Sequence, residues 1–166
     1  MSVIDVLAIK NAIKAQLDDN NVVTGVPIDL SGGMSDRVKK VLKVHIERIP
    51  IQPSFFPAIT IFTSDKDISQ RTIARNGAGG KRLGTYKLMI AGIVFNPSFT
   101  EDLDDSSDDE CEILMENIEE LLRSNTNLDK TCESAIPSKI TYHNSSYDEQ
   151  THMRVGILSL DVKVNY

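Results

Sequence analysis

The chain has 166 residues, a mass of 18.4 kDa and a net charge of −6. Its 40% hydrophobic and 25% charged residues are typical of a folded globular domain, which excludes disorder as the main state. The negative balance argues against a protein whose whole surface grips nucleic acid. No run approaches the roughly 18 apolar residues of a membrane span. The first residues show no secretory signal, so we expect synthesis in a cytoplasm.

The first third of the chain predicts one helix and little other regular structure. Apolar residues recur at three- and four-residue steps over 3–19, which indicates an amphipathic helix. Residues 22–36 contain glycines and a proline and predict a short strand followed by a loop. Within 37–49 apolar and polar residues alternate, although one helical turn would also fit. Because β-branched residues dominate, we prefer a strand over about 40–49.

The middle of the chain predicts the centre of a sheet. Pro57 is followed by the strongly β-prone run Ala58 to Phe62. Residues 64–82 are polar and rich in glycine in their second half, so we expect a long flexible loop there. Residues 83–96 form the longest strand pattern and are apolar on both faces at the centre, which predicts an inner strand.

The last third predicts a second helix and a hairpin. An acidic run occupies 101–110 and is followed by apolar residues at helical spacing over 111–123. Negative charge at a helix N-terminus favours the helix. After a polar turn at 124–130, two alternating segments at about 135–143 and 153–165 predict paired strands.

This order of elements predicts a single α+β domain spanning residues 1–166. The sheet should be mainly antiparallel (mixed), with two principal helices packed on one face. Cys111 and Cys132 are too few for a disulfide framework. We expect two reduced, partly buried thiols, and a single bridge between them stays open as the alternative.

Three segments resemble chemical sites and fail the tests for them. A phosphate-binding loop would need Gly at Arg75 and Ser or Thr at Arg82. A calcium loop starting at Asp102 would need Gly at Ser107 and Glu at Ile113. The spacing of Cys132, His143 and His152 matches no metal motif. We therefore expect no metal, no cofactor and no enzymatic activity.

The charged segments remain as candidate contact surfaces. Two segments are basic, and they contain Arg37, Lys39, Lys40, Lys43 and Arg48 in the first and Arg71, Arg75, Lys81 and Arg82 in the second. Both could be ordinary solvated faces. The functional alternative is contact with an acidic partner, including the acidic run of a neighbouring copy. Such complementarity mainly sets partner choice and association rate.

The order of the elements also resembles a known family. The residues that carry the likeness are Phe55-Phe56-Pro57-Ala58-Ile59-Thr60-Ile61, the strand Tyr86 to Val94, the helix Cys111 to Arg123, the Asn127-Leu128 turn and the closing Leu158-Ser159-Leu160-Asp161-Val162. Together they resemble the tail terminator proteins of long-tailed bacteriophages, and more loosely the related neck and tail-completion proteins. The resemblance covers nearly the whole chain.

The resemblance implies a structural virion protein of the tail or neck, made in the host bacterial cytoplasm. Such proteins form a ring, usually of six copies, that caps the tail tube, ends its polymerisation and offers a docking surface for the head connector. The implied partners are further copies of the chain, the tail tube protein and a neck or connector protein, with the sheath protein as a further candidate. Double-stranded DNA would pass through the lumen without specific binding. No catalytic residue, cofactor or membrane is implied.

Two residue sets are the candidate sites under this resemblance. The predicted partner-ring contacts are Arg71, Arg75, Lys81 and Arg82. The predicted lumen or subunit-interface acids are Asp102, Asp104, Asp105, Asp108 and Asp109. An acidic lumen would keep DNA phosphates from sticking, because like charges repel. The alternatives are a neck or head-completion protein and a non-viral adaptor that binds one protein partner.

Overall fold

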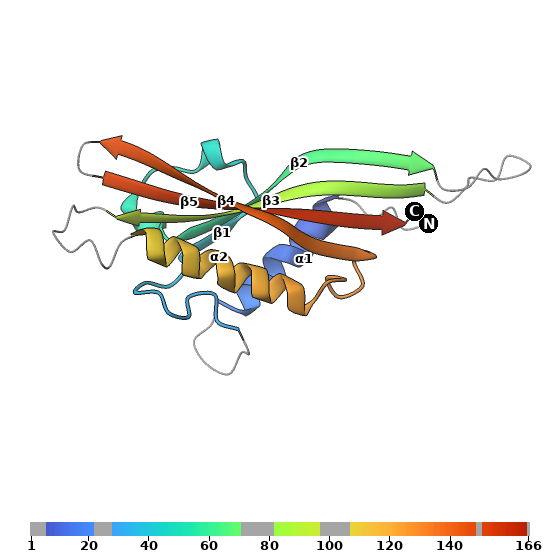
Figure 1. Ribbon diagram of the computed structural model, residues 1–166, viewed down its shortest axis with the longest axis horizontal. Helices are drawn as coiled ribbons and strands as arrows, with labels where there is room; N and C mark the ends of the chain where they lie inside the picture. Colours follow the sequence, from blue (N-terminus) through green and yellow to red (C-terminus); the bar gives the residue numbers. More distant parts are fainter. Residues whose placement is uncertain (1–5, 22–27, 71–81, 97–106, 149–150, 166) are drawn as a thin grey trace, which may run out of the picture.

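The computed structural model describes residues 6–21, 28–70, 82–96, 107–148 and 151–165. Its elements in chain order are α1 (Val6–Asp19), β1 (Lys40–Leu42), β2 (Ala58–Gln70), β3 (Arg82–Asn96), α2 (Ser107–Ser124), β4 (Ser134–Asp148) and β5 (Thr151–Asn165). Two short 3-10 helices, Ile46–Arg48 and Pro53–Phe55, lie between β1 and β2. The predicted α+β class is confirmed (Figure 1).

The five strands form one mixed sheet in the order β1-β2-β3-β5-β4. Only β1 and β2 run parallel, and every other neighbouring pair is antiparallel. The inner position predicted for β3 is confirmed, since it lies between β2 and β5. The strand is apolar on both faces because each face is covered: Leu88 and Ile90 pack in one buried cluster, Ala91 and Ile93 in another.

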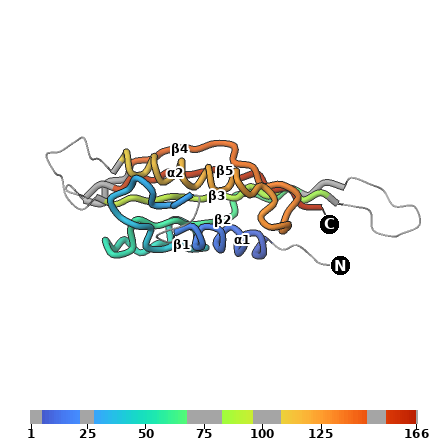
Figure 2. Tube along the Cα trace, turned by 90° about the horizontal axis from the view of Figure 1, so that it is seen from below, coloured from blue at the N-terminus to red at the C-terminus, as the bar shows by residue number. Residues whose placement is uncertain are grey.

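The two helices cover one face of the sheet. The helix α1 contacts β1 and β2, whereas α2 contacts β3, β5 and β4. Their apolar stripes, Ile9, Ile13 and Leu17 on α1 and Leu114 and Ile118 on α2, are fully buried. Burial of each such side chain contributes about 1.5–3 kcal/mol. Figure 2 shows α1 beside β1 at one edge of the sheet and β4 at the opposite edge.

Among the residues that the structure describes, cover on the opposite face of the sheet is confined to one end. There Ile49 and Phe56, from the segment between β1 and β2, pack on Ala58, Ala91 and Val155. Farther along the same face the apolar side chains are only half-buried; they are Phe62, Met89 and Ile157. The sheet therefore has one largely covered face, beneath the two helices, and one partly open face.

Two sequence predictions about loops and strands need correction. The loop predicted at 64–82 is wrong at both ends, because residues 64–70 continue β2 and Arg82 begins β3; residues 71–81 lie outside the described ranges. The strand predicted at 40–49 is confirmed only for 40–42. The Val44 carbonyl accepts a hydrogen bond from the Thr60 hydroxyl, and the 3-10 helix then begins at Ile46, so the ladder ends.

The second helix and the closing hairpin occur where the sequence predicts them, with boundaries shifted by up to five residues. The helix α2 begins at Ser107 rather than Cys111, so Asp108, Asp109 and Glu110 form its first turn. Residues 28–36 form turns, while the strand predicted just before them falls at 22–27, outside the described ranges.

Neither of the two described helices is long and apolar enough to cross a membrane.

Candidate functional site

Most residues of the two predicted sites fall outside the described ranges. Of the predicted partner-ring contacts, Arg71, Arg75 and Lys81 lie outside them, and the backbone of Arg82 pairs with Gln70 in the β2–β3 ladder. Of the predicted lumen or interface acids, Asp102, Asp104 and Asp105 lie outside them, whereas Asp108 and Asp109 are exposed in the first turn of α2. The described part of the chain therefore locates only these last two acids.

Asp108 is tied to the sheet by Arg154 of β5. The Arg154 Nε lies 3.6 Å from Asp108 Oδ1, and its Nη2 lies 4.0 Å from Glu112 Oε1. The Tyr142 ring lies 5.3 Å from the guanidinium carbon, and Nη1 donates to Asn144 Oδ1 at 2.7 Å. Arg154 was not among the residues that the sequence singled out. One feature of the sequence could have identified it: alternation along β5 places the charged Arg154 on the same strand face as the apolar Leu158 and Leu160.

The outward side of α2 carries three exposed glutamates at helical spacing, Glu112, Glu116 and Glu120, which we call the glutamate edge. Burial, with the negative charge of Glu112 and Glu116, raises the pKa of Tyr142. These two carboxylates therefore lie near β4, the last strand at this edge of the sheet. No residue that the structure describes forms an ion pair with Glu116 or Glu120.

The opposite edge of the sheet is basic. Lys39, Lys40 and Lys43 are exposed at β1, and with Lys10 of α1 we call them the lysine edge. Lys43 Nζ donates a hydrogen bond to Asn11 Oδ1, and burial together with the charge of Lys43 lowers the pKa of Lys10. None of the four has an ion pair within the described ranges.

The remaining basic residues of that segment behave differently. Arg37 Nη2 lies 3.7 Å from Asp29 Oδ2, and its Nη1 donates to the Asn21 carbonyl at 3.3 Å, so this side chain ties two loops together. Arg48 is exposed in the 3-10 helix. The fold therefore gathers at β1 only three of the five basic residues that the sequence grouped, and adds Lys10.

The partly open face of the sheet holds a shallow depression of about 400 Å³. It is lined by His45, Phe62, Thr63, Ser64, Met89, Thr141, Ile157 and Ser159. His45 and Phe62 meet at a ring-centroid distance of 4.8 Å. A lining of hydroxyls around apolar side chains suits contact with another protein better than capture of a charged small molecule. The alternating pattern of β3 predicted that its second face is apolar. It did not predict how much of that face other segments of the chain cover.

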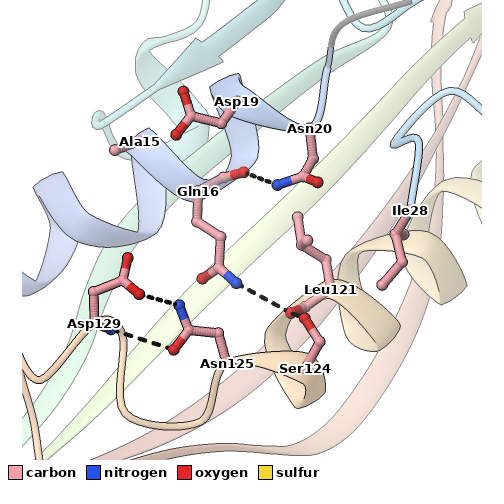
Figure 3. Close-up of a pocket in the computed structure, with 9 residues that line it drawn as sticks. All are labelled: Ala15, Gln16, Asp19, Asn20, Ile28, Leu121, Ser124, Asn125 and Asp129. Atoms are coloured by element: carbon pink, nitrogen blue, oxygen red, sulfur yellow. Dashed lines mark hydrogen bonds between the residues drawn. The ribbon is translucent and has the colours of Figure 1, made fainter. Parts of the chain in front are cut away.

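A second pocket of about 350 Å³ lies between the C-terminal ends of α1 and α2 (Figure 3). Gln16 Nε2 donates to the Leu121 carbonyl at 3.1 Å, which links the two helices. Asn125 and Asp129 bond to each other twice, through Asn125 Nδ2 to Asp129 Oδ1 and Asp129 N to Asn125 Oδ1. These bonds join the polar side chains of both helix ends, while Gln16 Oε1 stays buried without a hydrogen-bond partner among the described residues. We assign the pocket a structural role.

The groups that sequence reasoning tested for chemistry are separated. Cys111 and Cys132 are both buried and unpaired, which excludes the alternative of a bridge. Burial raises the pKa of the Cys111 thiol to about 12 and that of Cys132 to about 11, so both are neutral and unreactive near pH 7. Within the described ranges no three His, Cys, Asp or Glu side chains come together as metal ligands.

Comparison of the chain with protein-family models and with curated proteins gives no match in either case.

Proposed function

We propose that this chain is a structural subunit of a phage tail, and that it assembles into a ring that caps the tail tube. The ring ends tube polymerisation and provides the docking surface for the head or neck connector. The observation that carries the proposal is the element order α1-β1-β2-β3-α2-β4-β5, with its long inner strand and closing hairpin. That order is the one by which the sequence resembles tail terminator proteins.

The surfaces of the subunit support an assembly role. In the described ranges β4 pairs only with β5, and β2 beyond Thr60 pairs only with β3, so both leave backbone groups open to another chain. The glutamate edge, the lysine edge and the partly open face add contact surfaces on different sides. A ring subunit that also meets a tube and a connector needs several such surfaces. DNA crossing the lumen needs no specific site.

Electron microscopy of lysates tests the proposal directly. A phage in which the gene for this chain is inactivated should produce tails of uncontrolled length without heads, because nothing caps the tube. A plasmid copy of the intact gene should restore tails of normal length. Normal-length tails that stay unattached would instead assign the chain to the neck, and normal infectious particles would refute a virion role.

A second experiment addresses the connector surface. Reversing charge at Arg71, Arg75, Lys81 and Arg82 should give capped tails of normal length that fail to join heads. The matched control reverses four exposed lysines elsewhere, Lys66, Lys130, Lys139 and Lys163. If the first variant joins heads as efficiently as the control, these four residues do not contact the partner ring.

The partly open face favours one other candidate function, a non-viral adaptor that binds a single protein partner. Its depression of about 400 Å³ has the mixed apolar and hydroxyl lining of a protein contact. Native mass separates the two functions: an adaptor is a stable monomer at all concentrations, whereas a ring subunit forms assemblies of several copies, alone or on tail tubes.

A further inference from the structure

We infer that copies of this chain associate head to tail, with the lysine edge of one copy against the glutamate edge of the next. The lysine edge is Lys10, Lys39, Lys40 and Lys43, and the glutamate edge is Glu112, Glu116 and Glu120. The inference deepens the proposed function by naming the contact between ring subunits, and its closure into a ring rests on that function. The occupant of each edge is a second copy of this chain.

The two charged edges lie at opposite ends of the strand order. The lysine edge lies on α1 and β1, and the glutamate edge lies on α2 beside β4. β1 and β4 are the outermost strands of the sheet, and both helices cover the same face (Figure 2). The two charged edges therefore belong to one layer and point away from each other. A translated or rotated copy can bring them together without turning the sheet over.

Apart from Glu112, which lies 4.0 Å from Arg154, the charges of both edges form no ion pair within the described ranges of their own subunit. The nearest acid on α1, Asp18, is already paired with Lys14 at 2.6 Å. On α2, Glu119 is paired with Arg123 at 2.7 Å, which leaves Glu116 and Glu120 outside any ion pair of the described ranges. Burial and the charge of Lys43 lower the pKa of Lys10, so the lysines also repel one another. Opposite charges from a neighbour would relieve that repulsion.

Because the two edges point away from each other, a two-fold interface can contain only one of them. That edge would then face the same edge of its partner, lysines against lysines or glutamates against glutamates. Repulsion between these like charges disfavours the two-fold dimer. Only a heterologous contact pairs the edges, and repeating it gives a ring if the rotation closes.

Exchange of charge between the edges tests the inference. One variant, K39E/K43E, brings the summed charge of the lysine edge from +4 to 0; the other, E116K/E120K, reverses that of the glutamate edge from −3 to +1. Sedimentation velocity at low ionic strength should show assemblies larger than a dimer for the unmodified chain. Each variant alone should associate at least about tenfold more weakly, and an equimolar mixture of the two should recover association. Circular dichroism checks that each variant is folded.

A matched control keeps the test specific. The K139E/K163E variant makes the same charge change on exposed residues of β4 and β5 and should associate like the unmodified chain. The inference is overturned if the unmodified chain is a monomer, if the edge variants associate normally, or if the mixture recovers nothing. Rings formed through another surface would overturn it while the proposed function stands. Normal-length tails in the gene knockout would reject the proposed function, whereas the contact measured between purified copies would still stand.

Discussion

Met115 of α2 packs against two glycines that face each other across neighbouring strands, Gly92 of β3 and Gly156 of β5. A methyl group at Gly156 would lie 2.9 Å from Met115 Sδ and 3.2 Å from Tyr142 Cε1. At Gly92 it would lie 2.8 Å from the same sulfur. These distances are shorter than ordinary van der Waals contact. The absence of side chains at these two positions therefore sets how closely α2 approaches the sheet.

We expect Gly156→Ala to lower the free energy of unfolding by about 1–3 kcal/mol, because the helix must move or Met115 must leave its rotamer. Urea unfolding measures the change. Met115→Ala makes room and serves as the second arm of a double-mutant cycle. The double variant should lose clearly less stability than the two single changes added together. Additive losses would show that the methyl group at Gly156 does not act through Met115.

The two buried thiols should make stability depend on pH above neutrality. In the unfolded chain a cysteine titrates near about 8.5. In the folded chain burial raises the pKa of Cys111 to about 12 and of Cys132 to about 11. Folding thus favours the neutral thiols. Their contribution to stability is complete below the unfolded pKa and is lost as pH rises toward the folded values.

We therefore expect the stability of the unmodified chain to fall more steeply between pH 8 and about pH 11 than that of C111A/C132A. Urea midpoints at several pH values give the difference, and lysine and tyrosine titrations cancel because both proteins contain them. Parallel pH profiles for the two proteins would mean that the thiols ionise equally in both states.

At the scale of elements, the turn after α2 is built from an uncommon backbone. Leu128, Asp129 and Lys130 have φ values of 47°, 54° and 69°, and L-residues other than Gly, Asn and Asp rarely adopt this left-handed region. Leu128 is buried in the core, and Asp129 bonds to Asn125, so both side chains hold the turn. Lys130 is exposed and gives only its backbone N–H to Asn127 Oδ1 at 3.4 Å.

Lys130→Gly should raise the free energy of unfolding by about 0.5–1 kcal/mol, because glycine enters the left-handed region without steric cost. The matched control, Lys139→Gly in β4, places glycine in a strand and should be destabilising. Thermal and urea unfolding compare the two. Equal losses of stability would show that the backbone at residue 130 carries no relievable strain.

The partly open face gives a prediction about two phenylalanines. Phe56 is 4% exposed beneath the 3-10 segments and stacks on Phe95 at a centroid distance of 5.5 Å, whereas Phe62 on the same face is half-buried. Phe56→Ala should cost about 3–5 kcal/mol, as for other core phenylalanines, and Phe62→Ala clearly less. Urea unfolding of both variants checks this. Similar losses would mean that the face is covered along its whole length.

The elements that sequence reasoning predicted well are those with an apolar periodicity. The strand β3 and the helix α2 bury apolar residues at periods of about 2 and 3.6, and such patterns are visible without any contact. Residues 64–70 escaped prediction because Asp65, Lys66 and Asp67 are exposed and polar. Only their pairing with Lys87, Tyr86 and Thr85 makes them a strand, and pairing with a distant partner leaves no local signal.

Of the two charged edges, the sequence predicted the lysines near β1 as a charge cluster but did not predict the glutamates of α2 as a surface. Lys39 and Lys43 stand out in the sequence, yet Lys10 joins them only because α1 lies beside β1. The glutamates of α2 follow the acidic run in sequence, and their place at the opposite edge depends on the strand order. Tertiary pairing, which local composition does not encode, thus places the two charged segments at opposite edges of one sheet.

At the scale of the whole molecule, the two edges and the partly open face make opposite predictions about salt. The Debye length is about 30 Å at 0.01 M ionic strength and about 3 Å at 1 M, so salt screens exposed lysine and glutamate charges. Contacts between apolar surfaces are not weakened in this way, and salts such as sulfate strengthen them. The response of self-association to salt therefore identifies which surface joins the copies.

If the lysine edge meets the glutamate edge, raising NaCl from low concentration to about 0.5 M should weaken self-association severalfold and mainly slow its rate. Sodium sulfate at equal ionic strength should weaken it less. Light scattering after dilution follows both effects, and the K139E/K163E variant should respond like the unmodified chain. Association that strengthens in both salts would assign the contact to the face around Phe62, Met89 and Ile157, since burial of that half-buried apolar surface requires no charge pairing.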